Sequence, residues 1–310
     1  MLRYVGLFCL SFLSYQFFHF LALHLRSSSL HRYNYSKDGQ KPWAFISGSS
    51  DGIGRGFARE LARSGFNIIL HGRNPTKLEN VRQALAAEFP QASFRIVVAD
   101  VCESESQVLR RIDAIVEELR DLHLTVLVNN VGGAPPRMEP LYKPLEAYLP
   151  RDIDGMISMN LRFTAHLTRA LLPLLIGQNP SLIINIGSMA DVGLPWLSMY
   201  SGAKAFVMAW STALGREMKV ERKNVEVLGI RLMTVTDTSF RKEIPTIMQP
   251  DARTFAEACL QKVGCGRLVV TGYWAHDVML SIVSLLPEKM VLKISSDSIK
   301  KEAEKDKKRD

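Results

Sequence analysis

The stretch Ser47-Gly48-Ser49-Ser50-Asp51-Gly52-Ile53-Gly54 decides the fold predicted for this chain. It follows the apolar, strand-like run "WAFIS" (43–47) and precedes a helical pattern that begins near Arg55. Its glycines let the backbone turn tightly and come close to a ligand, and free N–H groups at the start of a helix favour the charge of a phosphate. A glycine triplet between a strand and a helix therefore predicts a binding site for a dinucleotide pyrophosphate.

Apolar, β-branched runs predict further strands along the chain. They are "FNIIL" (66–70), "FRIVVA" (94–99), "TVLV" (125–128), "LIINI" (182–186) and "VEVLGI" (225–230). Their nearly continuous hydrophobicity is typical of parallel strands that are buried on both faces. Helical patterns lie between them, one capped by Asn74 and Pro75 and another ended by Gly65. The pattern predicts an α/β fold, a doubly wound parallel sheet of the Rossmann type in a single domain.

We expect three segments within the 310 residues. Residues 1–41 form an N-terminal membrane anchor with a basic flank, residues 42–275 form the Rossmann-type domain, and residues 276–310 form a membrane-proximal segment with a basic tail. A helix is predicted over 251–263, capped by Asp251 and ended by Gly264. The apolar run "VMLSIVSLL" (278–286) is too short to span a bilayer, so it packs on the core or lies at the membrane interface.

Composition excludes some classes of function. Hydrophobic residues make up 47% of the chain and charged residues 23%, as in ordinary globular proteins. The formal charge of +8 is concentrated near both ends, and no basic stripe interleaved with aromatic residues suggests nucleic acid. Cys9, Cys102, Cys259 and Cys265 lack paired metal or redox spacing, so we expect no metal site and a reducing compartment.

The N-terminal run over residues 5–25 lacks acidic and strongly basic side chains and lies between Arg3 and Arg26. At about 1.5 Å per residue it can just cross a hydrocarbon core of about 30 Å. Polar residues within it keep two alternatives open, a cleaved signal peptide and a helix that lies in the membrane interface. We expect an anchor.

Flanking charge predicts the side of the membrane on which the domain lies. Arg26, Arg32, Lys37 and Lys41 follow the apolar run, so the positive-inside rule places the domain in the cytosol. Lys307 and Lys308 resemble a dilysine signal for retrieval to the endoplasmic reticulum, which is read from the cytosol. The sequon at Asn34 would argue instead for the lumen if it carried a glycan.

Three residues suggest proton chemistry. Tyr200 and Lys204 are one helical turn apart, on one face, and Ser188 precedes them in "INIGSMAD". A nearby ammonium can lower the pKa of a tyrosine, ordinarily near 10, by about 1–3 units.

After the second strand, Arg73 offers a guanidinium that can bind the 2′-phosphate of NADP(H) with two hydrogen bonds. A carboxylate at this place would instead favour NAD.

Together these motifs resemble the classical short-chain dehydrogenase/reductase family. The glycine stretch, Asp100, "NNVG" (129–132), Asn160, Ser188, Tyr200 and Lys204 run in family order over residues 43–240. The resemblance implies that Tyr200 donates a proton to a ketone oxygen, that Ser188 hydrogen-bonds the same oxygen, and that Asn160 supports a relay water. It implies an NADP(H) site that includes Gly48, Ser49, Ser50, Asp51, Gly52, Ile53, Gly54, Arg73, Asp100, Asn129, Gly132, Tyr200 and Lys204.

Within that family the chain is similar to membrane-bound very-long-chain 3-ketoacyl-CoA reductases and related 17β-hydroxysteroid dehydrogenases. The similarity lies in "GSSDGIGRGFARELARSGFNIILHGRN", "LVNNVG" and the C-terminal region. It implies reduction of a hydrophobic ketone, a long-chain 3-ketoacyl-CoA in fatty-acid elongation, by NADPH at the endoplasmic-reticulum membrane. A steroid or a specialised ketone is the alternative substrate, and a homodimer stays open as an assembly.

The resemblance is imperfect after the sixth strand, where the chain reads "RLMTVTD" (231–237). The family usually has a proline there and a threonine later, whereas this chain has Leu232 and Met233, and Asp237 takes the place of the threonine. A nucleotide-binding membrane scaffold without turnover is therefore a hypothesis of another class.

Overall fold

The computed structural model describes residues 2–135 and 138–306. Its centre is a seven-stranded parallel sheet in the order β3-β2-β1-β4-β5-β6-β7. The strands are β1 (Trp43–Ile46), β2 (Asn67–Gly72), β3 (Phe94–Val98), β4 (Leu124–Asn129), β5 (Ser181–Ile186), β6 (Val225–Arg231) and β7 (Val269–Thr271). The doubly wound parallel sheet and its predicted strands are confirmed. The sequence reading missed β7, because three residues are too few to show a pattern.

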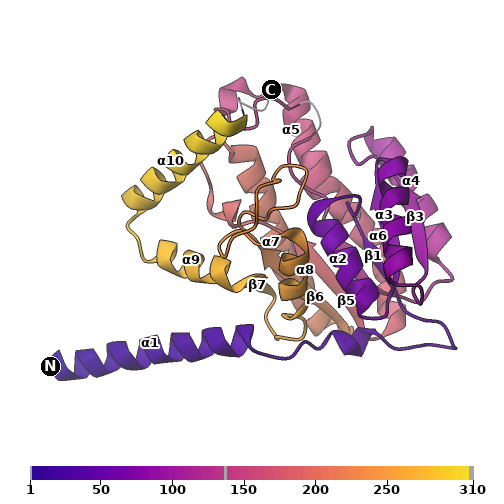
Figure 1. Ribbon diagram of the computed structural model, residues 1–310, viewed down its shortest axis with the longest axis horizontal. Helices are drawn as coiled ribbons and strands as arrows, with labels where there is room; N and C mark the ends of the chain where they lie inside the picture. The colour runs from indigo at the N-terminus through magenta and orange to yellow at the C-terminus, as the bar shows by residue number, and fades with distance from the viewer. Residues whose placement is uncertain (1, 136–137, 307–310) are drawn as a thin grey trace.

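Helices cover both faces of the sheet (Figure 1). The α-helices are α1 (Leu2–His24), α2 (Gly52–Arg63), α3 (Pro75–Glu88), α4 (Glu105–Leu119), α5 (Pro150–Ile157), α6 (Phe163–Gln178), α7 (Ser198–Val220), α8 (Ala252–Leu260), α9 (Trp274–Ser284) and α10 (Glu288–Asp306). Alternate side chains of β1 enter two separate cores: Ala44 and Ile46 pack with α2, α3 and α8, while Trp43 and Phe45 pack with α4, α6 and α7.

Helix boundaries follow the predicted capping residues. The Asn74 side chain accepts a hydrogen bond from Lys77 N–H at 2.9 Å, and Asp251 accepts one from Thr254 N–H at 2.8 Å. Gly65 has φ +94° just after α2, as a helix-ending glycine should. The predicted helix 251–263 is shorter than expected, because α8 ends at Leu260 and a tight turn leads to Gly264.

The N-terminal helix α1 extends away from the domain (Figure 1). The C-terminal end of α1 is bound to the domain: His24 Nε2 lies 2.9 Å from Asp277 Oδ2 of α9, and Lys262 Nζ donates to Leu23 O at 3.3 Å. Phe8, Phe17 and other apolar side chains earlier in α1 are exposed. Across residues 2–135 and 138–306, the structure has no helix long and apolar enough to cross a membrane. Lys307 and Lys308 lie outside the described residues.

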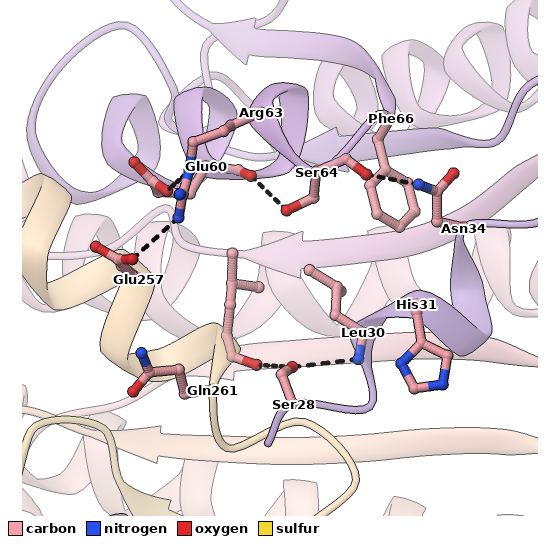
Figure 2. Close-up of a pocket in the computed structure, with 11 residues that line it drawn as sticks. Ser28, Leu30, His31, Asn34, Glu60, Arg63, Ser64, Phe66, Glu257 and Gln261 are labelled. Carbon is pink, nitrogen blue, oxygen red and sulfur yellow. Dashed lines mark hydrogen bonds and ion pairs between the residues drawn. The ribbon is translucent and has the colours of Figure 1, made fainter. Parts of the chain in front are cut away.

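The sequon residue Asn34 is bound to the domain. Its side-chain Nδ2 donates to Ser64 O at 2.5 Å and lies against Gly65, at the pocket between the N-terminal segment, α2 and α8 (Figure 2). A glycan on Nδ2 would have to displace this contact.

The strand order places the candidate site. The winding direction reverses between β1 and β4, and ligands of such sheets bind beyond the carboxyl ends of the strands at that reversal. The glycine stretch follows β1 there, and "NNVG" overlaps the end of β4.

Candidate active site

The glycine loop between β1 and α2 is closed by its own backbone. A Cβ added to Gly54 would lie only 2.2 Å from Gly48 O, so the two chain segments can meet only because residue 54 has no side chain. Gly48 itself has φ +68°. The Asp51 carboxylate caps α2 by accepting from Gly52 N–H at 2.7 Å. The loop thus leads into the N-terminus of α2, where backbone N–H groups that the Asp51 carboxylate does not take up suit a phosphate.

Two neighbouring residues hold this loop in place. Asn130 Nδ2 donates to both Ser47 O and Gly48 O at 3.0 Å, which ties the end of β4 to the loop. Ser49 is fully buried, and its hydroxyl accepts from His71 N–H at 3.0 Å. The Ser49 side chain therefore faces β2. Sequence analysis missed Asn130, although it stands within the "NNVG" motif.

His71 lies beneath the loop and was also missed. Its Nδ1 accepts from Gly48 N–H at 3.4 Å, and its ring stacks on Phe163 with the ring centroids 5.1 Å apart. Complete burial lowers the pKa of His71 to about 3, so the imidazole is neutral at physiological pH. A neutral ring can accept the Gly48 bond, whereas an imidazolium could not.

At the ends of β2 and β3 the structure brings Arg73 and Asp100 together around Cys102. Asp100 Oδ1 accepts from Cys102 N–H at 3.0 Å. Burial and Asp100 raise the pKa of Cys102 to about 11, while the exposed Arg73 acts in the opposite sense. Ser50 lies near Gly72 at the same strand end, whereas the Ile53 side chain packs into the core. Arg73 is thus an exposed guanidinium beside the predicted adenosine end of the cleft.

The other half of the site lies on α7. Lys204 is 4% exposed, and its ammonium donates to Ile186 O, the last residue of β5, at 3.1 Å. Burial lowers the pKa of Lys204 to about 8. The same Nζ lies 5.7 Å from the centroid of the Tyr200 ring, so the predicted pair does share one helix face.

The expected lowering of the Tyr200 pKa is wrong for this structure. Burial raises the pKa of Tyr200, and a hydrogen bond with Ser188 opposes the increase without cancelling it. The Lys204 ammonium binds the Ile186 carbonyl, so the desolvation of the phenolate dominates. Tyr200 therefore carries its proton at neutral pH, as a proton donor must.

Asn160 lies in a π-helical turn, Ser158–Arg162, between α5 and α6. Its amide exchanges two hydrogen bonds with the backbone of Gly133, each 2.9 Å long, and donates to Met156 O at 3.0 Å. A Cβ on Gly132 would lie 2.8 Å from Lys204 Nζ and 2.9 Å from Asn160 Oδ1. Gly132 is thus the position that lets Asn160 approach Lys204.

Asn129 lies deeper than the sequence suggested. Its Nδ2 donates to Thr168 Oγ1 and to Asn185 Oδ1, both at 2.8 Å, and Asn185 in turn donates to Ser211 Oγ on α7. The side chain of Asn129 therefore joins β4 to α6, β5 and α7 below the cleft. It supports the helix that carries Tyr200 and Lys204.

Of the residues that depart from the family pattern, Asp237 forms an ion pair with Arg55. Asp237 has φ +56°, and its Oδ2 lies 2.7 Å from Arg55 Nη2 in the first turn of α2. At the end of β6, Arg231 Nε lies 2.6 Å from Asp191 Oδ2. The altered segment is thus tied to the structure on both sides of the turn.

Comparison with known proteins agrees with this geometry. The model of the short chain dehydrogenase family matches residues 42–248. The chain belongs to this family. It is similar to a very-long-chain 3-oxoacyl-CoA reductase of Aspergillus niger, with 31% identity over 76% of this chain and 68% of the relative. As a short-chain dehydrogenase/reductase, the protein is an oxidoreductase.

Solved structures share the fold. A 7β-hydroxysteroid dehydrogenase has a TM-score of 0.71 at 19% identity, covering 86% of this chain and 98% of that one. A short-chain dehydrogenase from Sphingobium yanoikuyae in complex with NADPH has a TM-score of 0.64 at 21% identity, covering 80% and 97% of the two chains.

Proposed function

We propose that this protein is an NADPH-dependent ketone reductase in which Tyr200 donates the proton. One observation carries the proposal: Tyr200, Ser188 and the buried ammonium of Lys204 meet at the carboxyl edge of the sheet. A bound nicotinamide supplies the hydride to the carbonyl carbon. Tyr200 Oη gives its proton to the carbonyl oxygen while Ser188 Oγ hydrogen-bonds that oxygen, and the product is an alcohol.

Lys204 and Asn160 assist the proton transfer that Tyr200 and Ser188 carry out. The Lys204 ammonium, whose Nζ lies 5.7 Å from the centroid of the Tyr200 ring, offsets part of the cost of burying the tyrosinate that remains after proton transfer. Asn160 holds Gly133 beside it and provides the polar end of a path for the returning proton. Each of these groups is held before the substrate arrives, which favours the transition state.

The residues present fit NADP(H). The N-terminus of α2 would receive the pyrophosphate, with the backbone from Gly48 to Gly54 forming the surrounding loop. Arg73 would provide a fork for the 2′-phosphate, and Asp100 would face the adenine. Gly132 and Lys204 would hold the nicotinamide ribose. The family membership supports this arrangement, as does the NADPH complex of the Sphingobium yanoikuyae relative.

For the substrate we propose a long-chain 3-oxoacyl-CoA. The similarity to very-long-chain 3-oxoacyl-CoA reductases supports this choice. An apolar cluster of Met138, Tyr148 and Met156 packs against Met199 and Tyr200, so one wall beside the proton donor is apolar. Such a wall suits an acyl chain.

The test is NADPH consumption by the detergent-solubilised full-length protein with a long-chain 3-oxoacyl-CoA. Tyr200→Phe is expected to reduce kcat about 10²- to 10⁴-fold, the usual contribution of a positioned acid, while NADPH binding persists. Tyr15→Phe, on the exposed face of α1, is the matched control and should behave as wild type. NADPH binding without consumption on this substrate or on other ketones would instead support the silent scaffold.

Arg73 is expected to select the phosphorylated cofactor. Arg73→Ala should weaken the binding of NADPH about 10- to 100-fold, because a charged hydrogen bond contributes about 1.5–3 kcal/mol. The binding of NADH should stay almost unchanged, because NADH lacks the 2′-phosphate. Arg110→Ala removes an exposed arginine from α4 and serves as control. Equal losses for both cofactors would refute the role of Arg73. The measurement is KM for each cofactor.

We propose further that the protein lies at the endoplasmic-reticulum membrane with its catalytic domain in the cytosol, and that α1 is the anchor. The support is the exposed apolar surface of α1, on which Phe8, Phe17 and Phe18 are all more than half exposed, together with the basic residues that follow it. The function of the relatives in fatty-acyl chemistry supports the location.

Flotation with vesicles of neutral and anionic phospholipid tests the anchor. The full-length protein should float with the vesicles, and Phe8→Asp with Phe17→Asp should leave it in the dense fraction, because burying carboxylates in lipid is costly. Val220→Asp, at the exposed end of α7, is the control. Flotation that survives the double change would exclude α1 as the anchor.

A further inference from the structure

The chain after β6 makes a loop, residues 233–248, whose two ends are held together by His276 of α9. His276 Nδ1 accepts from Met233 N–H at 3.3 Å, and its Nε2 lies 3.2 Å from Met248 O. A neutral imidazole with its proton on Nε2 satisfies both contacts at once. Next to them, Thr236 N–H donates to Pro250 O at 2.9 Å. The base of the loop is therefore closed.

Within the loop, residues 237–241 form a tight turn. Thr238 N–H donates to Arg241 O at 2.9 Å, and Arg241 N–H donates back to Thr238 O at 3.2 Å. The Thr238 hydroxyl also accepts from Arg241 N–H, at 3.1 Å. Asp237 and Arg241 thus stand at the two ends of a small, internally hydrogen-bonded unit.

One end of this turn rests on the glycine loop. Asp237 is paired with Arg55 of α2, and the Thr238 side chain comes within 3.1 Å of the place where a Gly52 Cβ would lie. Gly52 is the first residue of α2, the helix end that the proposed function assigns to the pyrophosphate. The turn therefore borders the cofactor site.

The other end of the turn is bound by the C-terminal helix. Figure 1 shows that α9 leads away from the sheet and that α10 turns back toward the domain. There Glu302 forms an ion pair with Arg241. Lys300 lies over the Trp196 ring at 5.7 Å, and Ile299 is 6% exposed, so this half of α10 is packed on the domain.

The two ion pairs differ in exposure. The side chains of Arg55 and Asp237 are 44% and 54% exposed, whereas those of Arg241 and Glu302 are 20% and 22% exposed. Water screens the first pair more than the second. The ion pair between Arg241 and Glu302 of α10 therefore holds the turn more strongly than the pair between Asp237 and Arg55.

We propose that Glu302, acting through Arg241, is a positioning residue for the cofactor: it holds the 237–241 turn against the glycine loop and slows cofactor release. The inference rests on the proposed NADP(H) site and on no particular substrate. Helix α10, distant in sequence from the glycine loop, thereby becomes part of the cofactor-binding machinery.

The experiment measures the dissociation rate of NADPH from the full-length protein by stopped-flow fluorescence, without a ketone. Glu302→Gln should raise that rate about 2- to 5-fold, the range for an ion pair that water partly screens, and hydrogen exchange in residues 237–241 should increase. Glu302 also pairs with Lys305 at 3.1 Å. Lys305→Met removes that second pair alone, and it should leave the rate unchanged.

Variants with reversed charges at Arg241 and Glu302 distinguish a positioning role of this ion pair from a general contribution to stability. Glu302→Arg should accelerate NADPH release, and the double change Arg241→Glu with Glu302→Arg should return the rate toward wild type, which loss of packing could not do. A wild-type rate in Glu302→Gln, or no recovery in the double variant, would overturn the inference. If the wild-type protein did not bind NADPH at all, both the proposed cofactor and this inference would be wrong.

Discussion

The site depends on one constraint, the burial of the Lys204 ammonium. Removing a charge from water is costly, and the buried Lys204 ammonium donates a hydrogen bond to Ile186 O. The pKa of Lys204 is lowered to about 8 as a result. A fold keeps such a group only where the surrounding structure holds it firmly, and such positions are often functional. Here Lys204 is held between α7, on which it lies, and the end of β5, to which its ammonium donates.

Other features follow from the position of that ammonium. Residue 132 must be glycine for Asn160 to come close to Lys204. Helix α7 must be fixed, and the buried chain of amides from Asn129 through Asn185 to Ser211 joins it to the sheet. Tyr200 then lies one turn from Lys204, beside Ser188 and an apolar cluster. With its pKa raised by burial, Tyr200 keeps its proton at neutral pH and so has one to donate.

Local patterns predicted much of this arrangement. Continuous apolar runs located β1 to β6, the Asn74 and Asp251 side chains marked helix starts, and the glycine stretch located the start of α2. Long-range contacts could not be predicted in the same way. The bond from Gly48 to His71, the tie between Asn130 and the loop, and the return of α10 to Arg241 join residues far apart in sequence. The direction of the shift in the Tyr200 pKa was predicted wrongly, because the spacing of Tyr200 and Lys204 in the sequence does not show how deeply the phenol is buried.

The most direct measurement is the pH dependence of kcat/KM for ketone reduction by the full-length protein at saturating NADPH. If Tyr200 donates its proton beside the Lys204 ammonium, the rate should stay level through neutral pH and fall as pH rises above about 8, where Lys204 loses its charge. A rate that rises between pH 6 and 8 would mean that the tyrosinate is required. A rate that stays level to pH 10 would show that neither group acts as described.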